Sequence, residues 1–210
     1  MAWTDLEIAN MALVRMGIHK QLTVLPDTSS EGKALAVLLP KVKERVLSAY
    51  PWSWALRHVA LAAATGAPAT LPFGWTYAYD KPADMLRPVR LWDGARRFPL
   101  EDTLPFQVAP VLVGETLASA LLTDASDAEL IYITNGWLAA TPTVTPPSCI
   151  DDVVAWLLAA ELAMPLAKRP DLSGALAKTA AAELRRAQAL DRGAVAQDPS
   201  PIPYNLRARG

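Results

Sequence analysis

The chain has little of what metalloproteins, secreted proteins and many enzymes are built from. Its 210 residues include one cysteine and two histidines, and its formal net charge is −1. A single cysteine cannot form an internal disulfide, so the sequence predicts a protein made in a reducing cytoplasm. The near-zero net charge provides no general attraction to nucleic acid or to an anionic membrane. It does not exclude a local patch of charge.

Long apolar runs are also missing from the sequence. No run approaches the ~20 apolar residues that a membrane-spanning helix needs. The segment Met1-Ala2-Trp3-Thr4-Asp5 has neither the basic start nor the apolar centre of a signal peptide. Because 52% of the residues are apolar and 20% are charged, we expect a folded protein that is assembled inside a cell.

Candidate nucleophiles and metal ligands lack the neighbours that their chemistry needs. Neither His19 nor His58 has a histidine or cysteine at metal-ligand spacing. Cys149 would need an activating base, and we expect it to be a small residue at a helix start. Ser30 and Lys33 match the S-x-x-K pattern of acyl-serine enzymes, but the supporting motifs are missing and Ser30 fits better as a helix cap.

Paired carboxylates are the remaining catalytic candidates. Asp80 and Asp84 lie close in sequence, and Glu101-Asp102 and Asp151-Asp152 are adjacent pairs. A glycosidase needs two carboxylates that face each other across a cleft. The pair Asp151-Asp152 is explained by its place in a first helical turn, where acids favour the helix dipole. We therefore expect no catalytic residue, no metal and no cofactor, and hence not an enzyme.

Helical patterns occupy both ends of the chain. The pair Thr4 and Glu7 forms a capping box before an apolar stripe that ends at Gly17. A second helix is predicted from Ser29 or Ser30 to Tyr50, with Pro40 inside it. Near the C-terminus we expect one helix capped by Ser148, with Asp151 at its third position, and a last helix capped by Asp171 and reaching about Leu190.

The middle of the chain has a strand pattern. Short apolar runs are separated by proline and glycine, and Asp93-Gly94 is a tight-hairpin signal. The expected strands are Trp75–Tyr79, Val89–Trp92, Phe106–Val113 and Leu130–Thr134. A plausible exposed turn, residues 124–127, precedes the last of them.

The predicted fold class is therefore α+β. A helical bundle, built from the N- and C-terminal helix pairs, carries an inserted small antiparallel β domain. The expected parts are 1–51, the N-terminal helical part; 52–147, the β-rich domain; 148–192, the C-terminal helices; and 193–210, an extended arm. Pro199, Pro201 and Pro203 exclude a helix in that arm, so its apolar residues are expected to dock on another subunit.

Seven tryptophans suggest extensive packing or contact area, because aromatic residues are enriched in interface cores. For Trp52, Trp54 and Trp156 a place in the core is the favoured interpretation. For Trp75, Trp92 and Trp137, core and interface roles both stay open. Trp52 and Trp54 are expected to point to one side of an extended chain, after Pro51 stops the helix, and to anchor one module on the other.

In order and spacing, these motifs resemble the tail tubular protein A family, the head-to-tail adaptors of short-tailed bacteriophages. The matching segments cover nearly the whole chain: Leu6–Gly17 with its N-x-A-L core, Asp27-Thr28-Ser29, Tyr50-Pro51-Trp52-Ser53-Trp54-Ala55, Trp75–Arg87 with its Y-x-Y-x-x-P-x-D-x-L-R pattern, and Leu130-Ile131-Tyr132-Ile133.

The resemblance implies a structural protein of the virion, assembled in the host cytoplasm. Such a protein forms a gatekeeper ring, of twelve copies in this family, that joins the portal to the tail nozzle and surrounds the DNA channel without binding DNA specifically. The C-terminal segment is implied to contact the portal. The residues assigned to that contact are Ile202, Tyr204, Leu206, Arg207 and Arg209. Two alternatives stay open: a head-completion adaptor of a long-tailed phage, and a tail-associated peptidoglycan hydrolase.

Overall fold

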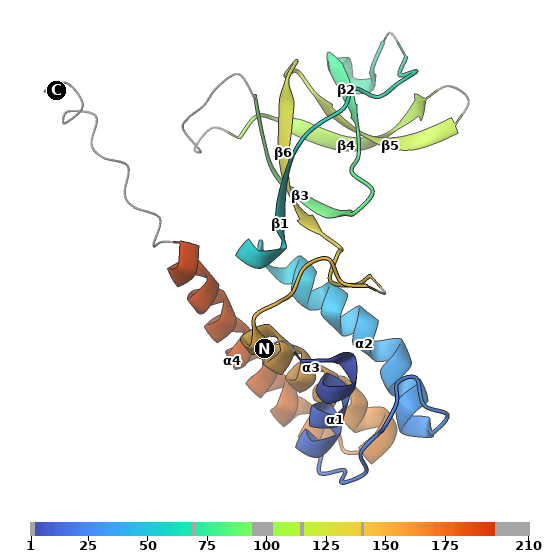
Figure 1. The fold of residues 1–210 in the computed structure, drawn as a ribbon, viewed down its shortest axis with the longest axis vertical. Helices are drawn as coiled ribbons and strands as arrows, with labels where there is room; N and C mark the ends of the chain where they lie inside the picture. Colours follow the sequence, from blue (N-terminus) through green and yellow to red (C-terminus); the bar gives the residue numbers. More distant parts are fainter. Residues whose placement is uncertain (1–2, 69, 94–102, 114–115, 140, 196–210) are drawn as a thin grey trace, which may run out of the picture. The chain divides into compact units, whose positions relative to one another are not determined.

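The computed structural model describes residues 3–68, 70–93, 103–113, 116–139 and 141–195. These residues form a mixed α+β structure with four α-helices and two three-stranded antiparallel sheets (Figure 1). The α+β class expected from the sequence is therefore confirmed. The chain divides into two compact units, a helical one from residues 1–42 and 147–210 and a β-rich one from residues 43–146.

In the helical unit, α1 (Asp5–Arg15) begins at the expected capping box. The Glu7 N–H donates to Thr4 Oγ1 at 3.2 Å, and the Thr4 N–H donates back to Glu7 Oε2 at 2.6 Å. Both bonds satisfy N–H groups that a helix start leaves without partners. Gly17 follows the helix with a φ of +76°, in the left-handed region that glycine adopts without strain. The structure confirms this part of the prediction.

The second helix, α2 (Ser30–Ala49), runs through Pro40 as one element and ends next to Tyr50, as expected. Its cap is Ser29, whose Oγ accepts the Gly32 N–H at 3.1 Å, so the assignment of the cap to Ser30 is wrong. A Cβ on Gly32 would come within 2.7 Å of the Asp27 backbone oxygen. Glycine is therefore required where the preceding turn folds back onto the helix.

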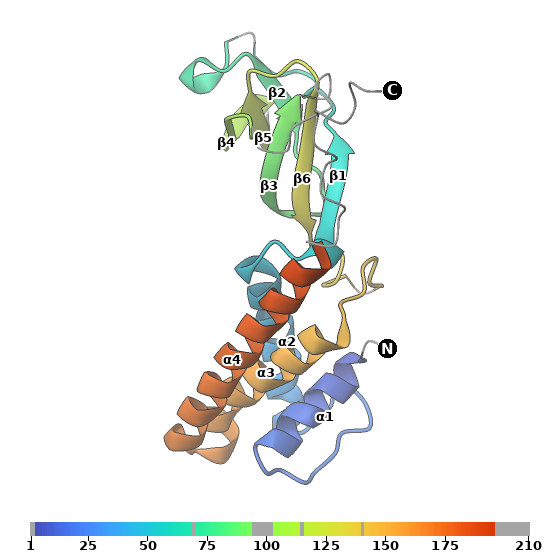
Figure 2. The ribbon, with the colours of Figure 1, turned by 90° about the vertical axis from the view of Figure 1, so that its left-hand side faces the viewer.

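The C-terminal helices α3 (Ser148–Ala167) and α4 (Pro170–Val195) pack side by side, and α1 packs on α3 (Figure 2). Both cap predictions are wrong. Ser148 is the first residue of α3 and Pro147 stands at its N-cap, where no side chain makes a capping bond. Asp171 lies inside α4, which starts one residue earlier. The first residue of α4 is Pro170. Proline is well suited to a first helical position, because the N–H that it lacks would have no partner within the helix.

Polar contacts from the N-terminal segment reach the start of α3. The buried carboxylate of Asp151 accepts the Trp3 N–H at 2.8 Å. Arg15 pairs with Asp152 and donates to its carbonyl oxygen at 2.9 Å, while its guanidinium lies 3.9 Å from the centre of the Trp156 ring. The two adjacent acids thus hold the N-terminal helix to α3.

In the β-rich unit, sheet A has the order β1-β6-β3 and sheet B the order β2-β5-β4. The strands are β1 (Leu56–Ala60), β2 (Tyr77–Asp80), β3 (Met85–Asp93), β4 (Phe106–Val113), β5 (Thr116–Thr123) and β6 (Ala128–Thr134). Four strands were expected near these positions, and β1 and β5 were not. The turn at 124–127 is confirmed. The segment that follows the expected turn at Asp93-Gly94, Arg96-Arg97-Phe98, lies outside the described residues.

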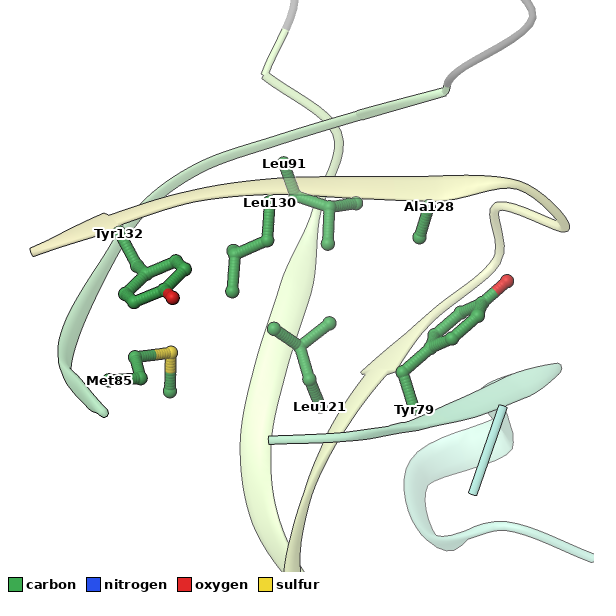
Figure 3. Close-up of a cluster of buried hydrophobic side chains, with 7 residues drawn as sticks. All are labelled: Tyr79, Met85, Leu91, Leu121, Ala128, Leu130 and Tyr132. Atoms are coloured by element: carbon green, nitrogen blue, oxygen red, sulfur yellow. The ribbon is translucent and has the colours of Figure 1, made fainter. Parts of the chain in front are cut away.

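Side chains from the two sheets point toward one another and form one core (Figure 3). Leu130 on β6 lies between Val59 and Leu91, and Leu121 on β5 lies between Tyr79 and Val108. A second cluster covers the other face of sheet B. Its buried members are Leu71, Ala78, Ala109, Val111, Ala120 and Leu122. The β-rich unit is therefore layered about sheet B.

The core contact between the sheets should control the stability of the β-rich unit. Leu130 is fully buried, whereas Leu117 on β5 is 73% exposed. We expect Leu130→Ala to lower the free energy of unfolding by about 2–5 kcal/mol, because it removes buried methyl groups and leaves a cavity. Leu117→Ala, the matched control, should cost less than about 1 kcal/mol. Urea unfolding of the full chain measures both, and equal losses would contradict the assignment.

Candidate assembly surfaces

The residues weighed above as candidate ligands and nucleophiles have neighbours within the fold. His58 Nε2 lies 2.7 Å from Glu129 Oε2, and the Trp92 indole donates to the same oxygen at 2.6 Å. These three side chains link β1, β6 and β3 on the face of sheet A away from the core. Burial raises the pKa of the Cys149 thiol, which favours the protonated form rather than the nucleophilic thiolate.

The carboxylates also bind groups of their own unit. Both oxygens of Asp84 accept hydroxyl groups, from Tyr132 at 2.8 Å and from Thr134 at 2.7 Å. Asp151 and Asp152 hold the N-terminal segment, as described above, and Glu101-Asp102 lies outside the described residues. Within the described part of the chain, no group of three or more His, Cys, Asp or Glu could hold a metal ion.

The pKa values of Asp84 and of its partner Tyr132 shift in opposite directions. Burial alone would raise the pKa of Asp84, but the hydroxyl donors Thr134 and Tyr132, with Arg57 nearby, together lower it below its usual 3.8. On the other side of the bond, burial and the adjacent carboxylate raise the pKa of Tyr132 to about 12. The hydroxyl therefore stays protonated and the carboxylate ionised at neutral pH, which is the state that preserves the bond.

Trp52 is the first of the two predicted anchoring aromatics. It is fully buried, its indole N–H donates to the Val46 carbonyl oxygen at 2.8 Å, and its ring meets the Tyr50 ring edge-on at 4.9 Å. Val46 lies in the last turn of α2, and Tyr50 is the residue that follows the helix. Because Val46 lies in the part of α2 that belongs to the β-rich unit, Trp52 joins this helix end to the chain that enters β1.

Trp54 has different neighbours. Residues 53–55 form a single 3₁₀ turn, so the expectation of an extended chain here is wrong. The Trp54 ring meets the Trp137 ring edge-on at 5.5 Å, and the buried Lys43 ammonium lies 5.0 Å from the Trp137 ring centre. Trp137 is 4% exposed, which assigns it to the core rather than to an interface. Trp52 and Trp54 therefore have different partners: Trp52 contacts Val46 and Tyr50, and Trp54 contacts Trp137.

Large apolar side chains remain exposed on sheet B, and the sequence analysis did not single them out. Val108, Leu112 and Leu117 on β4 and β5 are 38%, 55% and 73% exposed. The strand Phe106–Val113 is apolar at nearly every position, so the sequence has no alternation that separates its exposed side from its buried side. Without β5 in the prediction, the face on which they gather could not be assigned.

The residues expected to bind the portal, Ile202, Tyr204, Leu206, Arg207 and Arg209, lie outside the described residues. Helix α4 extends to Val195, past the boundary at 192 expected from the sequence. Among the described helices, none is both long enough and apolar enough to cross a membrane. No protein-family model matches the chain, and no curated protein matches it.

We expect the Trp52 indole bond to contribute measurably to stability. Trp52→Phe removes the donor to Val46 and part of a buried ring, so the free energy of unfolding should fall by about 1–3 kcal/mol. Trp75→Phe is the matched control, because the Trp75 ring is only partly buried, against the second cluster, and its indole donates to Gln107 at 3.3 Å in an exposed hydrogen bond. The control should lose less free energy of unfolding than Trp52→Phe, because a partly exposed hydrogen bond contributes less than a buried one. Urea unfolding followed by far-ultraviolet circular dichroism compares the two variants, and indistinguishable values would contradict a stabilising role for the bond from Trp52 to Val46.

The Asp84 network predicts a specific loss of stability in acid. Because the folded pKa of Asp84 lies below its unfolded value, its contribution is complete above about pH 4 and disappears as the pH falls through the folded pKa. The stability difference between the wild type and Asp84→Asn should therefore shrink below that pH. In Tyr132→Phe, Asp84 keeps the hydroxyl donor Thr134. The stability difference between the wild type and this variant should therefore change less with pH than the difference for Asp84→Asn. A difference that stays constant down to the acid limit of folding would contradict the assignment.

Proposed function

We propose that this chain is a structural head-to-tail adaptor of a bacteriophage virion, which forms a ring between the portal and the tail nozzle around the DNA channel. The observation that carries the proposal is the ordered series of motifs resembling the tail tubular protein A family, centred on Tyr50-Pro51-Trp52-Ser53-Trp54. The α+β class agrees with it. In the proposed arrangement, N- and C-terminal helices complete one bundle, the β-rich unit is inserted in it, and the C-terminal arm is extended.

The local structure of the central motif supports the proposal. Pro51 lies two residues after the end of α2, Trp52 holds the helix end, and the 3₁₀ turn at Trp54 leads directly into β1. A short connection of this kind, held by a buried hydrogen bond, is compatible with a structural role for the motif. A family motif with a structural task is also expected to have its aromatic residues buried, as Trp52 is.

The ring is proposed to contain twelve copies and to form on the portal rather than in free solution. Heterologous contacts between identical subunits close into a ring when the rotation between neighbours divides a full turn. The arm residues Ile202, Tyr204, Leu206, Arg207 and Arg209 are proposed to dock on the portal, with ordering coupled to binding. Genomic DNA is proposed to pass through the channel without specific binding, and a net charge of −1 provides no general attraction to its phosphates.

Deletion of residues 196–210 tests the docking role, because α4 ends at Val195 and stays complete. We expect the truncated chain to fold with unchanged circular dichroism and to lose binding to purified portal rings in co-sedimentation. Tyr204→Ala should weaken binding strongly, and the neighbouring Asn205→Ala should not. Undiminished binding by the truncated chain would reject the docking role of the arm. Failure of the full chain to bind any portal, with clearing of peptidoglycan in a zymogram, would overturn the adaptor proposal.

A further inference from the structure

Basic residues recur at every seventh position along α4. Lys178, Arg185 and Arg192 are all exposed, and seven residues make nearly two helical turns. The three side chains therefore form a row along one side of the helix, spaced about 10 Å apart along its axis, which we call the basic row. The opposite side of α4 packs on α3 (Figure 2), and its buried residues are Leu176, Ala180 and Ala187.

The acids of α4 lie away from the members of the basic row. At about 100° per residue, Glu183 and Asp191 are placed roughly 100° or more around the helix from each member. Glu183 pairs instead with Arg186 at 3.7 Å. Asp171, seven positions before Lys178, ends the row on its N-terminal side. The positions three and four residues from each member, where a helix forms its ion pairs, carry no acid within α4. They are Gly174, Ala175, Ala181, Ala182, Gln188, Ala189 and Val195.

Small residues occupy most of the positions between the members of the row, so a partner can approach this side of the helix closely. A helix that binds a membrane surface needs large apolar residues beside its basic ones. Leu190, an exposed large apolar residue of α4, lies roughly 120° or more around the helix from the row. The row therefore suits an extended anionic polymer better than it suits a bilayer.

We propose that the basic row binds the phosphate backbone of double-stranded DNA without reading its sequence. Lysine and arginine are common phosphate-contacting residues in protein–DNA complexes. A duplex carries one negative charge per ~1.7 Å of its axis, so a straight row about 20 Å long meets phosphates at many positions along it. Binding to a single strand uses aromatic side chains for stacking, and α4, which is described along its whole length, has none.

This contact goes beyond the proposed function, in which DNA only passes through the ring. It also concerns the chain by itself, because all three members of the row belong to one helix of one copy. The net charge of −1 does not oppose it, because the row is a local feature of one helix face.

Fluorescence anisotropy of a labelled duplex, titrated with the full chain at a series of salt concentrations, tests the contact. The logarithm of the binding constant should fall linearly with the logarithm of the salt concentration, with a slope of about −2.7 for three phosphate contacts. Between about 50 and 200 mM salt this slope corresponds to a loss of affinity of about 40-fold. Duplexes of unrelated sequence should bind alike, because phosphate contacts carry no sequence information.

The row variant, with Lys178→Gln, Arg185→Gln and Arg192→Gln, should lose this salt-dependent binding. Glutamine is a good helix former, so α4 should stay folded, and circular dichroism checks that it does. The matched control changes three exposed lysines outside the row, with Lys33→Gln, Lys41→Gln and Lys81→Gln. Both variants remove the same number of positive charges. The control should keep the slope of the wild type.

Three results would each overturn the inference. The first is a wild type that does not bind the duplex even at about 20 mM salt, including a chain that instead co-sediments with vesicles of anionic lipid. The second is unchanged duplex binding by the row variant, which would assign the binding to other basic residues. The third is equal loss in both variants, which would show that net charge alone matters. Portal binding, which tests the adaptor function, should be unchanged in the row variant, so the two proposals can fail separately.

Discussion

The hydrogen bond from the Trp52 indole to the Val46 carbonyl fixes where α2 ends and how the chain leaves it. A helix can be stopped by the proline at position 51, but proline alone does not determine the direction of the next residues. The buried Trp52 ring does so by packing on the helix it has just left. The 3₁₀ turn then begins at Ser53 and β1 begins at Leu56, seven residues after Ala49. The start of sheet A therefore depends on this contact.

Sheet A is in turn tied together by polar groups on both of its faces. On the core side, Asp84 joins the start of β3 to Tyr132 and Thr134 on β6. On the other side, Glu129 binds His58 from β1 and Trp92 from β3. Each carboxylate accepts hydrogen bonds from two side chains, and these bonds stabilise its charged form. The hydrogen bonds of Asp84 and Glu129 thus connect strands of sheet A, which gives both acids a structural role.

Local signals explain which parts of the fold could be predicted from the sequence. The capping box at Thr4, the glycine stop and the long apolar stripes are interactions between near neighbours, so α1 and α2 were placed to within a residue. The caps of α3 and α4 are misassigned because both helices begin earlier than their polar residues indicate: Pro147 stands at the N-cap of α3, and Pro170 is the first residue of α4. Strand β5 was missed because its residues face two different clusters, which weakens alternation. Trp137 could not be assigned to the core without knowledge of Trp54 and Lys43 as neighbours.

The distribution of polar and apolar groups indicates what kind of contact is left for partners. The carboxylates of Asp84, Glu129 and Asp152 are already bound within their own units. Groups that are held by internal bonds must lose them to meet a partner, and this loss opposes binding. Apolar side chains such as Leu112 and Leu117 have no such bonds to lose, and covering them releases water from their surface. The proposed ring would therefore gain most from association through shape and apolar area, and a net charge of −1 adds little repulsion between the copies that the proposal requires.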